Sequence, residues 1–166
     1  MLAEVVSGSV GILDTVSPIR RMLAHTDLHV RDIESIDIKN STVTTTAGFR
    51  PHTHVIHYDH LVFALGNVTD FRGLRGLPEH AIPFKKLGDA LYLRNHLIHV
   101  LEEAAIEVDS PDLRRQLLTF VVAGGGFSGV EVVAEDHDFV REVVKNYPQL
   151  DPADVRVKRL MLSRAH

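Results

Sequence analysis

The chain has 166 residues, of which 45% are hydrophobic and 24% charged, values typical of a globular protein with room for one domain or parts of two. Its net charge of -4 gives no basic field of the kind that binds nucleic acid. There is no cysteine, so disulfides, thiol nucleophiles and cysteine-ligated zinc are excluded. No apolar run approaches the roughly 18 residues of a membrane span, and the N-terminus lacks a secretory signal. We expect a soluble, cytoplasmic protein.

The first part of the chain predicts strands rather than long helices. Met1–Gly11 is apolar without a clear period, and Ser17-Pro18 begins a short helix because proline suits a first helical turn. Three strands follow, joined by turns such as Lys39-Asn40-Ser41 into an antiparallel meander: residues 29–38, 42–46 and 54–58.

Two further segments complete this part. Leu61–Ala64 is a continuous apolar run that ends at Leu65-Gly66, which is typical of a strand buried on both faces. Residues 67–83 carry two glycines and two prolines. This composition predicts a connection between domains.

Beyond Pro83 the hydrophobic pattern predicts two helices, followed by a strand, a helix and another strand. A long helix is predicted from about Leu87 to Glu107, with a shorter one from Asp109-Ser110-Pro111 to Leu117. A strand over Thr119–Ala123 leads through glycines into a helix from Phe127 to about Asn146. The core face of that helix is expected to contain Val130, Val133, Val140 and Val144. Val155–Leu162 is the next predicted strand, which completes a strand–helix–strand unit.

Three glycines between Ala123 and Val130 have the spacing G-x-G-x-x-G. In a dinucleotide-binding turn, Gly124 permits the tight bend, Gly126 lets the backbone approach a pyrophosphate, and Gly129 lets helix and strand pack closely. A helix that begins near Phe127 would direct its free N–H groups at the phosphates. The alternative is a glycine-rich turn that merely links strand to helix.

Eleven histidines raise the question of a metal site. His52, His54, His57 and His60 crowd one stretch without a tight ligand pair and a carboxylate partner. His96 and His99 share a helix face but lack the glutamate–histidine pattern of a helical metal site. We therefore predict no metal site and interpret these side chains as solvated surface histidines.

Three segments together carry a resemblance to a known family: HYDHLVFALGN (57–67), PFKKLGDALYLRNHL (83–97) and FVVAGGGFSGVEVVAE (120–135). They resemble the type II, non-proton-pumping NADH:quinone dehydrogenases, which are flavoproteins with two dinucleotide-binding domains. The resemblance implies an incomplete α/β, Rossmann-like fold with an antiparallel meander and a parallel βαβ sheet. Residues 1–83 would be a remnant of the FAD-binding domain, and residues 84–166 the N-terminal part of the NADH-binding domain. The absence of cysteine excludes the disulfide reductases of the same architecture.

The resemblance implies that electrons pass from NADH through FAD to a quinone, with the cofactor carrying the chemistry. The residues implied to hold the NADH pyrophosphate are Gly124, Gly125, Gly126, Phe127, Ser128 and Gly129. Glu131 is implied to act near the nicotinamide and flavin as a catalytic group; its alternative role is a first-turn carboxylate that stabilises the helix dipole. Val30, Ala64, Leu65 and Gly66 are implied to border FAD, although a strand simply ending at glycine would look the same.

The chain also departs from the family pattern. The glycine motif for the FAD pyrophosphate is absent, and Val133 replaces a small residue. Asp136 stands where leucine is expected, and burying it would be costly without a partner. Ser163-Arg164 lies where an acidic residue would bind the adenine ribose.

We therefore expect a truncated chain with little bound FAD and little turnover. Two alternatives stay open: a non-catalytic module that binds a nucleotide or a protein partner, and an NADH-dependent flavoprotein reductase with another acceptor. For the full-length relatives, the resemblance implies a peripheral position on the cytoplasmic face of the inner membrane. A homodimer is a further alternative.

Overall fold

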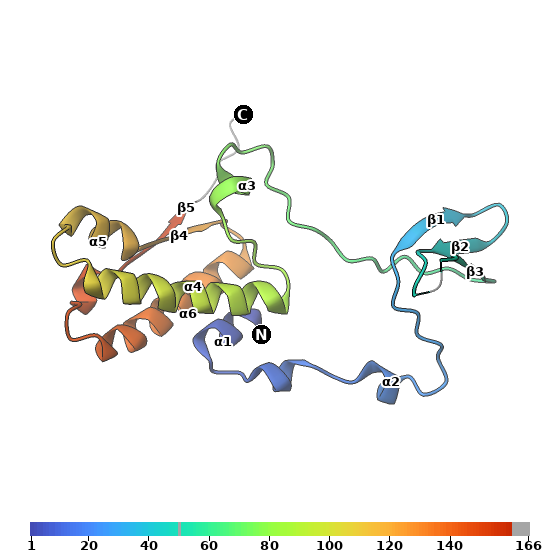
Figure 1. Cartoon of the computed structure of the whole chain (residues 1–166), viewed down its shortest axis with the longest axis horizontal. Helices are drawn as coiled ribbons and strands as arrows, with labels where there is room; N and C mark the ends of the chain where they lie inside the picture. The colour runs from blue at the N-terminus through green and yellow to red at the C-terminus, as the bar shows by residue number, and fades with distance from the viewer. Residues whose placement is uncertain (50, 161–166) are drawn as a thin grey trace. The chain divides into compact units, whose positions relative to one another are not determined.

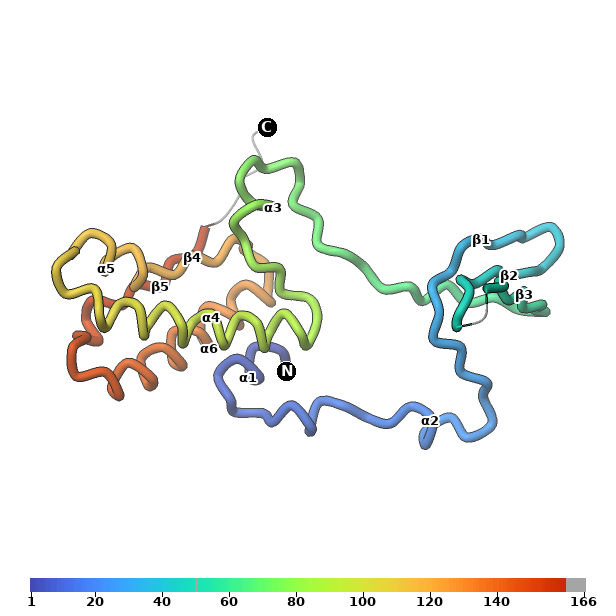
Figure 2. Tube along the Cα trace, in the orientation of Figure 1, coloured from blue at the N-terminus to red at the C-terminus, as the bar shows by residue number. Residues whose placement is uncertain are grey.

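The structure, a computed structural model, describes residues 1–49 and 51–160. The chain forms two compact units, which are coloured along the sequence in Figures 1 and 2. Ser17–Asn67 forms the meander unit, and Met1–Val16 together with the residues from Val68 onward forms the helical unit. Packing therefore groups the first residues with the C-terminal half. The assignment of residues 1–83 and 84–166 to flavin and nicotinamide domains stays a prediction.

The meander unit contains the predicted three-stranded antiparallel sheet, in the order β1-β2-β3. Its strands are β1 (Ile33–Asp37), β2 (Thr42–Thr45) and β3 (His54–His57), and one exposed helical turn, α2 (Ile19–Met22), precedes them. The turn between β1 and β2 is closed by Asn40, whose backbone and side-chain N–H groups donate to the Asp37 carboxylate at 3.0 and 2.7 Å. The prediction of a meander is confirmed.

The predicted buried strand at Leu61–Ala64 is wrong. These residues form no strand, and the side chains of Val62 and Phe63 are 84% and 62% exposed. A strand buried on both faces needs neighbouring strands and two covering layers. Within the described part of the chain, no strand pairs with this segment.

The helical unit has a core built by three helices that are distant in sequence (Figure 1). α1 (Leu2–Ser7) lies against both α4 (Leu87–Ile106) and α6 (Phe127–Val143). The sequence showed no clear period in α1, yet Val5 and Val6 are buried in this core. The remaining elements are η1 (Ile12–Thr15), α3 (Leu77–His80), α5 (Pro111–Leu117), η2 (Val144–Asn146), η3 (Pro152–Asp154) and the strands β4 (Thr119–Ala123) and β5 (Arg156–Leu160).

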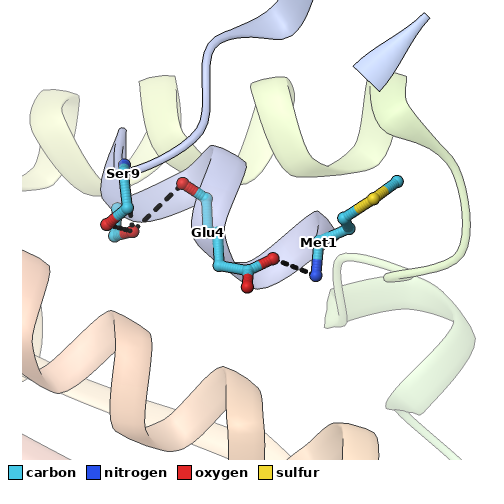
Figure 3. Close-up of polar contacts among 4 residues, drawn as sticks. Met1, Glu4 and Ser9 are labelled. Atoms are coloured by element: carbon cyan, nitrogen blue, oxygen red, sulfur yellow. Dashed lines mark hydrogen bonds and ion pairs between the residues drawn. The ribbon is translucent and has the colours of Figure 1, made fainter. Parts of the chain in front are cut away.

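Hydrogen bonds within α1 close its last turn, as Figure 3 shows around Met1, Glu4 and Ser9. The Ser7 hydroxyl donates to the Glu4 carbonyl at 3.1 Å and lies 2.8 Å from the Ser9 hydroxyl. The terminal ammonium of Met1 pairs with the Glu4 carboxylate. The helix then ends at Gly8, whose φ of 82° is the left-handed conformation that favours glycine.

The buried face of α6 differs from the predicted one. Val140 and Val144 are fully buried, as predicted, but Val130 is 47% exposed and Val133 only partly buried. Val132 and Phe139 are buried instead. The buried residues at four-residue spacing along this helix are Val132, Asp136, Val140 and Val144. The first turn of α6 extends beyond the core, so the side chain of Val130 stays in contact with solvent.

β4 and β5 pair in parallel, with Thr119 opposite Arg156 and Ala123 opposite Leu160. α6 connects the two strands and packs on both. The predicted strand–helix–strand unit is therefore confirmed, although Met161 and Leu162 lie outside the described residues. Among the helices that the structure describes, none combines the length and the apolar character needed to cross a membrane.

Candidate functional site

The glycine turn connects the end of β4 to the start of α6. Gly124 has a φ of 146°, a conformation that other residues rarely adopt, and its N–H donates to the Leu160 carbonyl of β5 at 3.0 Å. Gly126 then caps α6 and accepts a hydrogen bond from the Val130 N–H at 3.2 Å. The bend that the sequence predicts at Gly124 is present.

Gly129 lies in direct contact with the backbone of Gly124. A Cβ at position 129 would lie 2.6 Å from the Gly124 oxygen and 3.1 Å from its carbonyl carbon. Both atoms belong to the backbone and cannot rotate away. Close approach of α6 to the turn therefore requires glycine at position 129.

The fold does not require glycine at position 126. Its φ of −76° and ψ of 176° are open to any residue. A Cβ there would have no described atom within 4 Å. The space beside Gly126 is open, as a backbone that admits a pyrophosphate must be.

The start of α6 is exposed and free of side-chain caps. Within the described residues, no side chain accepts from the first N–H groups of the helix, and its first turn contains no acidic residue. Phe127 is 92% exposed, and Ser128 and Gly125 are exposed as well. Unpaired N–H groups at the positive end of a 17-residue helix have the polarity that suits a negatively charged ligand.

Glu131 is the fifth residue of α6 and is exposed. It therefore lies beyond the first helical turn, and the interpretation as a first-turn carboxylate on the helix dipole is wrong. The charge of Glu131 is near the Met1 ammonium, whose pKa is raised by the hydrogen bond to Glu4 and, to a smaller extent, by Glu131 and Glu135.

The residues implied to border FAD lie in the meander unit. Val30 is 71% exposed, and its carbonyl accepts a hydrogen bond from the Arg31 guanidinium at 2.9 Å. Ala64 and Leu65 are exposed too, and Gly66 has a φ of 73° with open space around it. The glycines of this unit are Gly48 and Gly66, and neither begins a helix. The described residues thus fit one dinucleotide turn, in the helical unit, and supply no second cradle for a flavin pyrophosphate.

Asp136 is buried on the stripe of α6 between Val132 and Val140, with 4% of its surface exposed. Its Oδ1 has no hydrogen-bond partner among the described residues. Burial and then the charge of Glu135 raise the pKa of this carboxyl to about 7. The sequence identified the residue as costly if buried, and the structure confirms that it is buried.

Among residues 1–49 and 51–160, no group of three histidine or acidic side chains is placed to hold a metal ion. The rings of His52 and His54 lie 5.2 Å apart at a tilt, without a third ligand. Ser163-Arg164, considered for the adenine ribose, lies outside the described residues.

β4 and β5 pair in parallel and are joined by a helix whose uncapped N-terminus follows G-x-G-x-x-G, which is the arrangement of a dinucleotide-binding βαβ unit. The comparisons place this unit among known proteins. The chain is 36% identical over 129 residues to a probable mitochondrial NADH-ubiquinone oxidoreductase of Schizosaccharomyces pombe, covering 75% of this chain and 23% of that protein. It is 31% identical over 158 residues to the external alternative NAD(P)H-ubiquinone oxidoreductase B4, mitochondrial, of Arabidopsis thaliana, covering 90% and 27%.

The fold matches solved structures of NDH2 from Plasmodium falciparum, one in complex with RYL-552 and one in complex with NADH. The TM-scores are 0.85 and 0.83 at 23% identity, covering 96% and 95% of this chain and 33% of each of those chains. No protein-family model matches. The chain is thus a relative of the type II NADH:quinone dehydrogenases, as the resemblance indicated, and it spans about a quarter of the length of the curated relatives it matches.

Proposed function

We propose that the helical unit binds NADH by its pyrophosphate at the turn from Gly124 to Gly129. The observation that carries this proposal is the contrast between two glycines. Gly129 is required by packing against Gly124, whereas Gly126 faces open space in an ordinary backbone conformation. Because the fold does not need glycine at position 126, a ligand that approaches the backbone there is the physical reason for it.

The chain's own groups supply the binding. The N–H groups of Phe127, Ser128 and Gly129 would donate to the phosphate oxygens, and the dipole of α6 would favour their negative charge. Glu131 follows one turn later on the same helix and is proposed to orient the nicotinamide carboxamide. When bound, the nicotinamide supplies hydride chemistry.

In the whole dehydrogenase, we propose that electrons pass from NADH through FAD to a quinone. The relatives are named NADH- or NAD(P)H-ubiquinone oxidoreductases, which supports the donor and the acceptor. Val30, Ala64, Leu65 and Gly66 would border the flavin, although the described residues do not form a flavin cradle by themselves. We therefore propose that the isolated 166-residue chain retains nucleotide binding and lacks turnover. Peripheral membrane association and dimerisation belong to the full-length protein in this proposal.

The location in the cell also stays a proposal. The sequence predicts a cytoplasmic placement, whereas the names of the curated relatives describe mitochondrial proteins.

Titrating NADH into the purified chain and following nucleotide fluorescence tests the proposal. We expect saturable binding by the unmodified chain. Gly126→Val should weaken it by about tenfold or more, the equivalent of at least about 1.4 kcal/mol, with unchanged circular dichroism. Gly88→Val, outside the turn and with open space around an added Cβ, is the matched control for a glycine replacement. Fluorescence that does not respond to the unmodified chain, or equal binding by Gly126→Val, would contradict the proposal.

Flavin content separates the alternatives. The chain purified in the presence of excess FAD should retain less than stoichiometric flavin and show no NADH:quinone turnover. Stoichiometric yellow flavin with quinone reduction would show a complete enzyme, and flavin with reduction of another acceptor would favour the alternative reductase. NADH binding without flavin is also the behaviour of a non-catalytic nucleotide-binding module.

A further inference from the structure

A cavity of about 530 Å³ opens where α5 meets the beginning of the β4–β5 sheet. Its lining residues come from α5 and from the first positions of both strands: Asp112, Arg115, Gln116, Thr119, Arg156 and Lys158. The glycine turn follows the opposite end of β4. Gly124 lies five positions after Thr119 of the cavity lining, which is about 16 Å at about 3.3 Å per residue.

The strand register brings the cationic side chains together. Arg156 pairs with Thr119, and Lys158 follows two residues later, so both cationic side chains point to the same face of the sheet. Arg115 joins them from the last turn of α5. The Thr119 hydroxyl donates to the Arg115 carbonyl at 2.7 Å, which ties the end of α5 to the start of β4.

These three cations have no close carboxylate partner, and Arg115 and Arg156 also line an adjoining pocket that contains Asp151 and Asp154. Within the described residues, Arg115, Arg156 and Lys158 form no ion pair with a carboxylate. Asp112 is the one acidic residue of the lining, so the cavity carries an excess of two positive charges, three minus one. This excess occurs in a chain whose net charge is -4. Neighbouring like charges repel, and a multiply charged anion between them removes that cost.

We infer that this cavity is a second anion site, which binds a small, multiply charged ligand of the phosphate class. Arg115 and Arg156 present planar forks that match two phosphate oxygens, and Lys158 adds a point charge. The Gln116 amide is a further donor. Thr119 contributes no proton, because its hydroxyl already donates to the Arg115 carbonyl. The site is separate from the NADH turn and does not depend on the function proposed for it.

Calorimetric titration of the intact chain with inorganic phosphate and with pyrophosphate at low salt tests this inference. We expect binding that weakens with added salt and that persists in Gly126→Val, a variant in which the glycine turn no longer contributes to anion binding. The double variant Arg156→Gln/Lys158→Gln should weaken it by about tenfold or more. The double variant Arg141→Gln/Lys145→Gln removes the same charge from exposed positions on α6 and η2 and should bind as the unmodified chain does.

Several outcomes would overturn the inference. The first is absence of phosphate binding, and the second is an equal loss of phosphate binding in both double variants. The third is loss of phosphate binding in Gly126→Val with retention in Arg156→Gln/Lys158→Gln, which would place the anion at the glycine turn. Acetate should bind more weakly than phosphate. Binding of an acidic peptide by the cavity in the absence of phosphate binding would also contradict the inference, since the site would then recognise a protein. Failure of NADH binding alone contradicts only the function proposed above.

Discussion

The guanidinium carbon of Arg94 lies 5.2 Å from the centre of the Phe139 ring, and its Nη1 donates to the Val6 carbonyl at 3.0 Å. One side chain of α4 therefore contacts both α6 and α1. The interaction satisfies a carbonyl at the end of a short helix and places the cation over the face of an aromatic ring. It links the N-terminal segment to the helix that carries the glycine turn.

Replacing Arg94 by methionine should lower the free energy of unfolding of the helical unit by about 1–2 kcal/mol. The apolar stem is retained, whereas the hydrogen bond and the contact of the cation with the ring are lost. Urea unfolding followed by far-ultraviolet circular dichroism measures the change. Arg141→Met, at an exposed position of α6, should change stability by no more than about 0.5 kcal/mol. Equal effects of the two variants would show that the Arg94 contacts contribute nothing.

Gly129→Ala should destabilise the helical unit by about 1–3 kcal/mol, because its Cβ would lie 2.6 Å from the Gly124 oxygen. Gly88→Ala is the matched control. Gly88 lies in α4 with open space around a Cβ, so alanine should raise stability by up to about 1 kcal/mol through helix propensity. Thermal unfolding of the two variants should therefore shift in opposite directions, and a tolerated Gly129→Ala would contradict the close contact.

Asp136→Leu should stabilise the chain at pH 8 by about 1–3 kcal/mol. The buried carboxylate has no hydrogen-bond partner for Oδ1 among the described residues, and it lies between apolar neighbours on α6. Leucine replaces an uncompensated charge with apolar surface. Asp138→Leu, at an exposed position of the same helix, should leave stability nearly unchanged. Lower stability of Asp136→Leu at pH 8 would mean that the carboxylate has a compensating partner.

The same residue predicts a pH dependence. The pKa of Asp136 is raised in the folded state from 3.8 to about 7, so the folded chain binds its proton more tightly than the unfolded chain. The contribution of protonated Asp136 to the free energy of unfolding is fully present below about pH 4, decreases as the pH rises towards 7, and is lost above that value. Relative to Asp136→Asn, the unmodified chain should therefore lose stability between about pH 4 and pH 7, by on the order of 1.4 kcal/mol per unit, with little further change above pH 7. Parallel stability profiles of the two proteins would contradict the raised pKa.

The elements with strong local signals were predictable from the sequence. β4 has the predicted bounds, α4 begins at Leu87 as predicted, and the meander has its predicted order. Hydrophobic period, proline and glycine act over a few residues, so the sequence is sufficient to locate such elements. The relation to the NADH dehydrogenases was also visible in local motifs, and the comparisons confirm it.

The sequence by itself determined the glycine turn, the helix that follows it and the parallel strand that completes the unit. Only the tertiary structure decided that α1 packs into the core, that Phe63 is exposed, and which face of α6 is buried. It alone showed that Gly129 is needed for packing while Gly126 is not, and that Arg115 and Arg156 line one cavity. The physical reason is that burial and charge depend on neighbours distant in the chain, whereas turns and helices form from contacts along it.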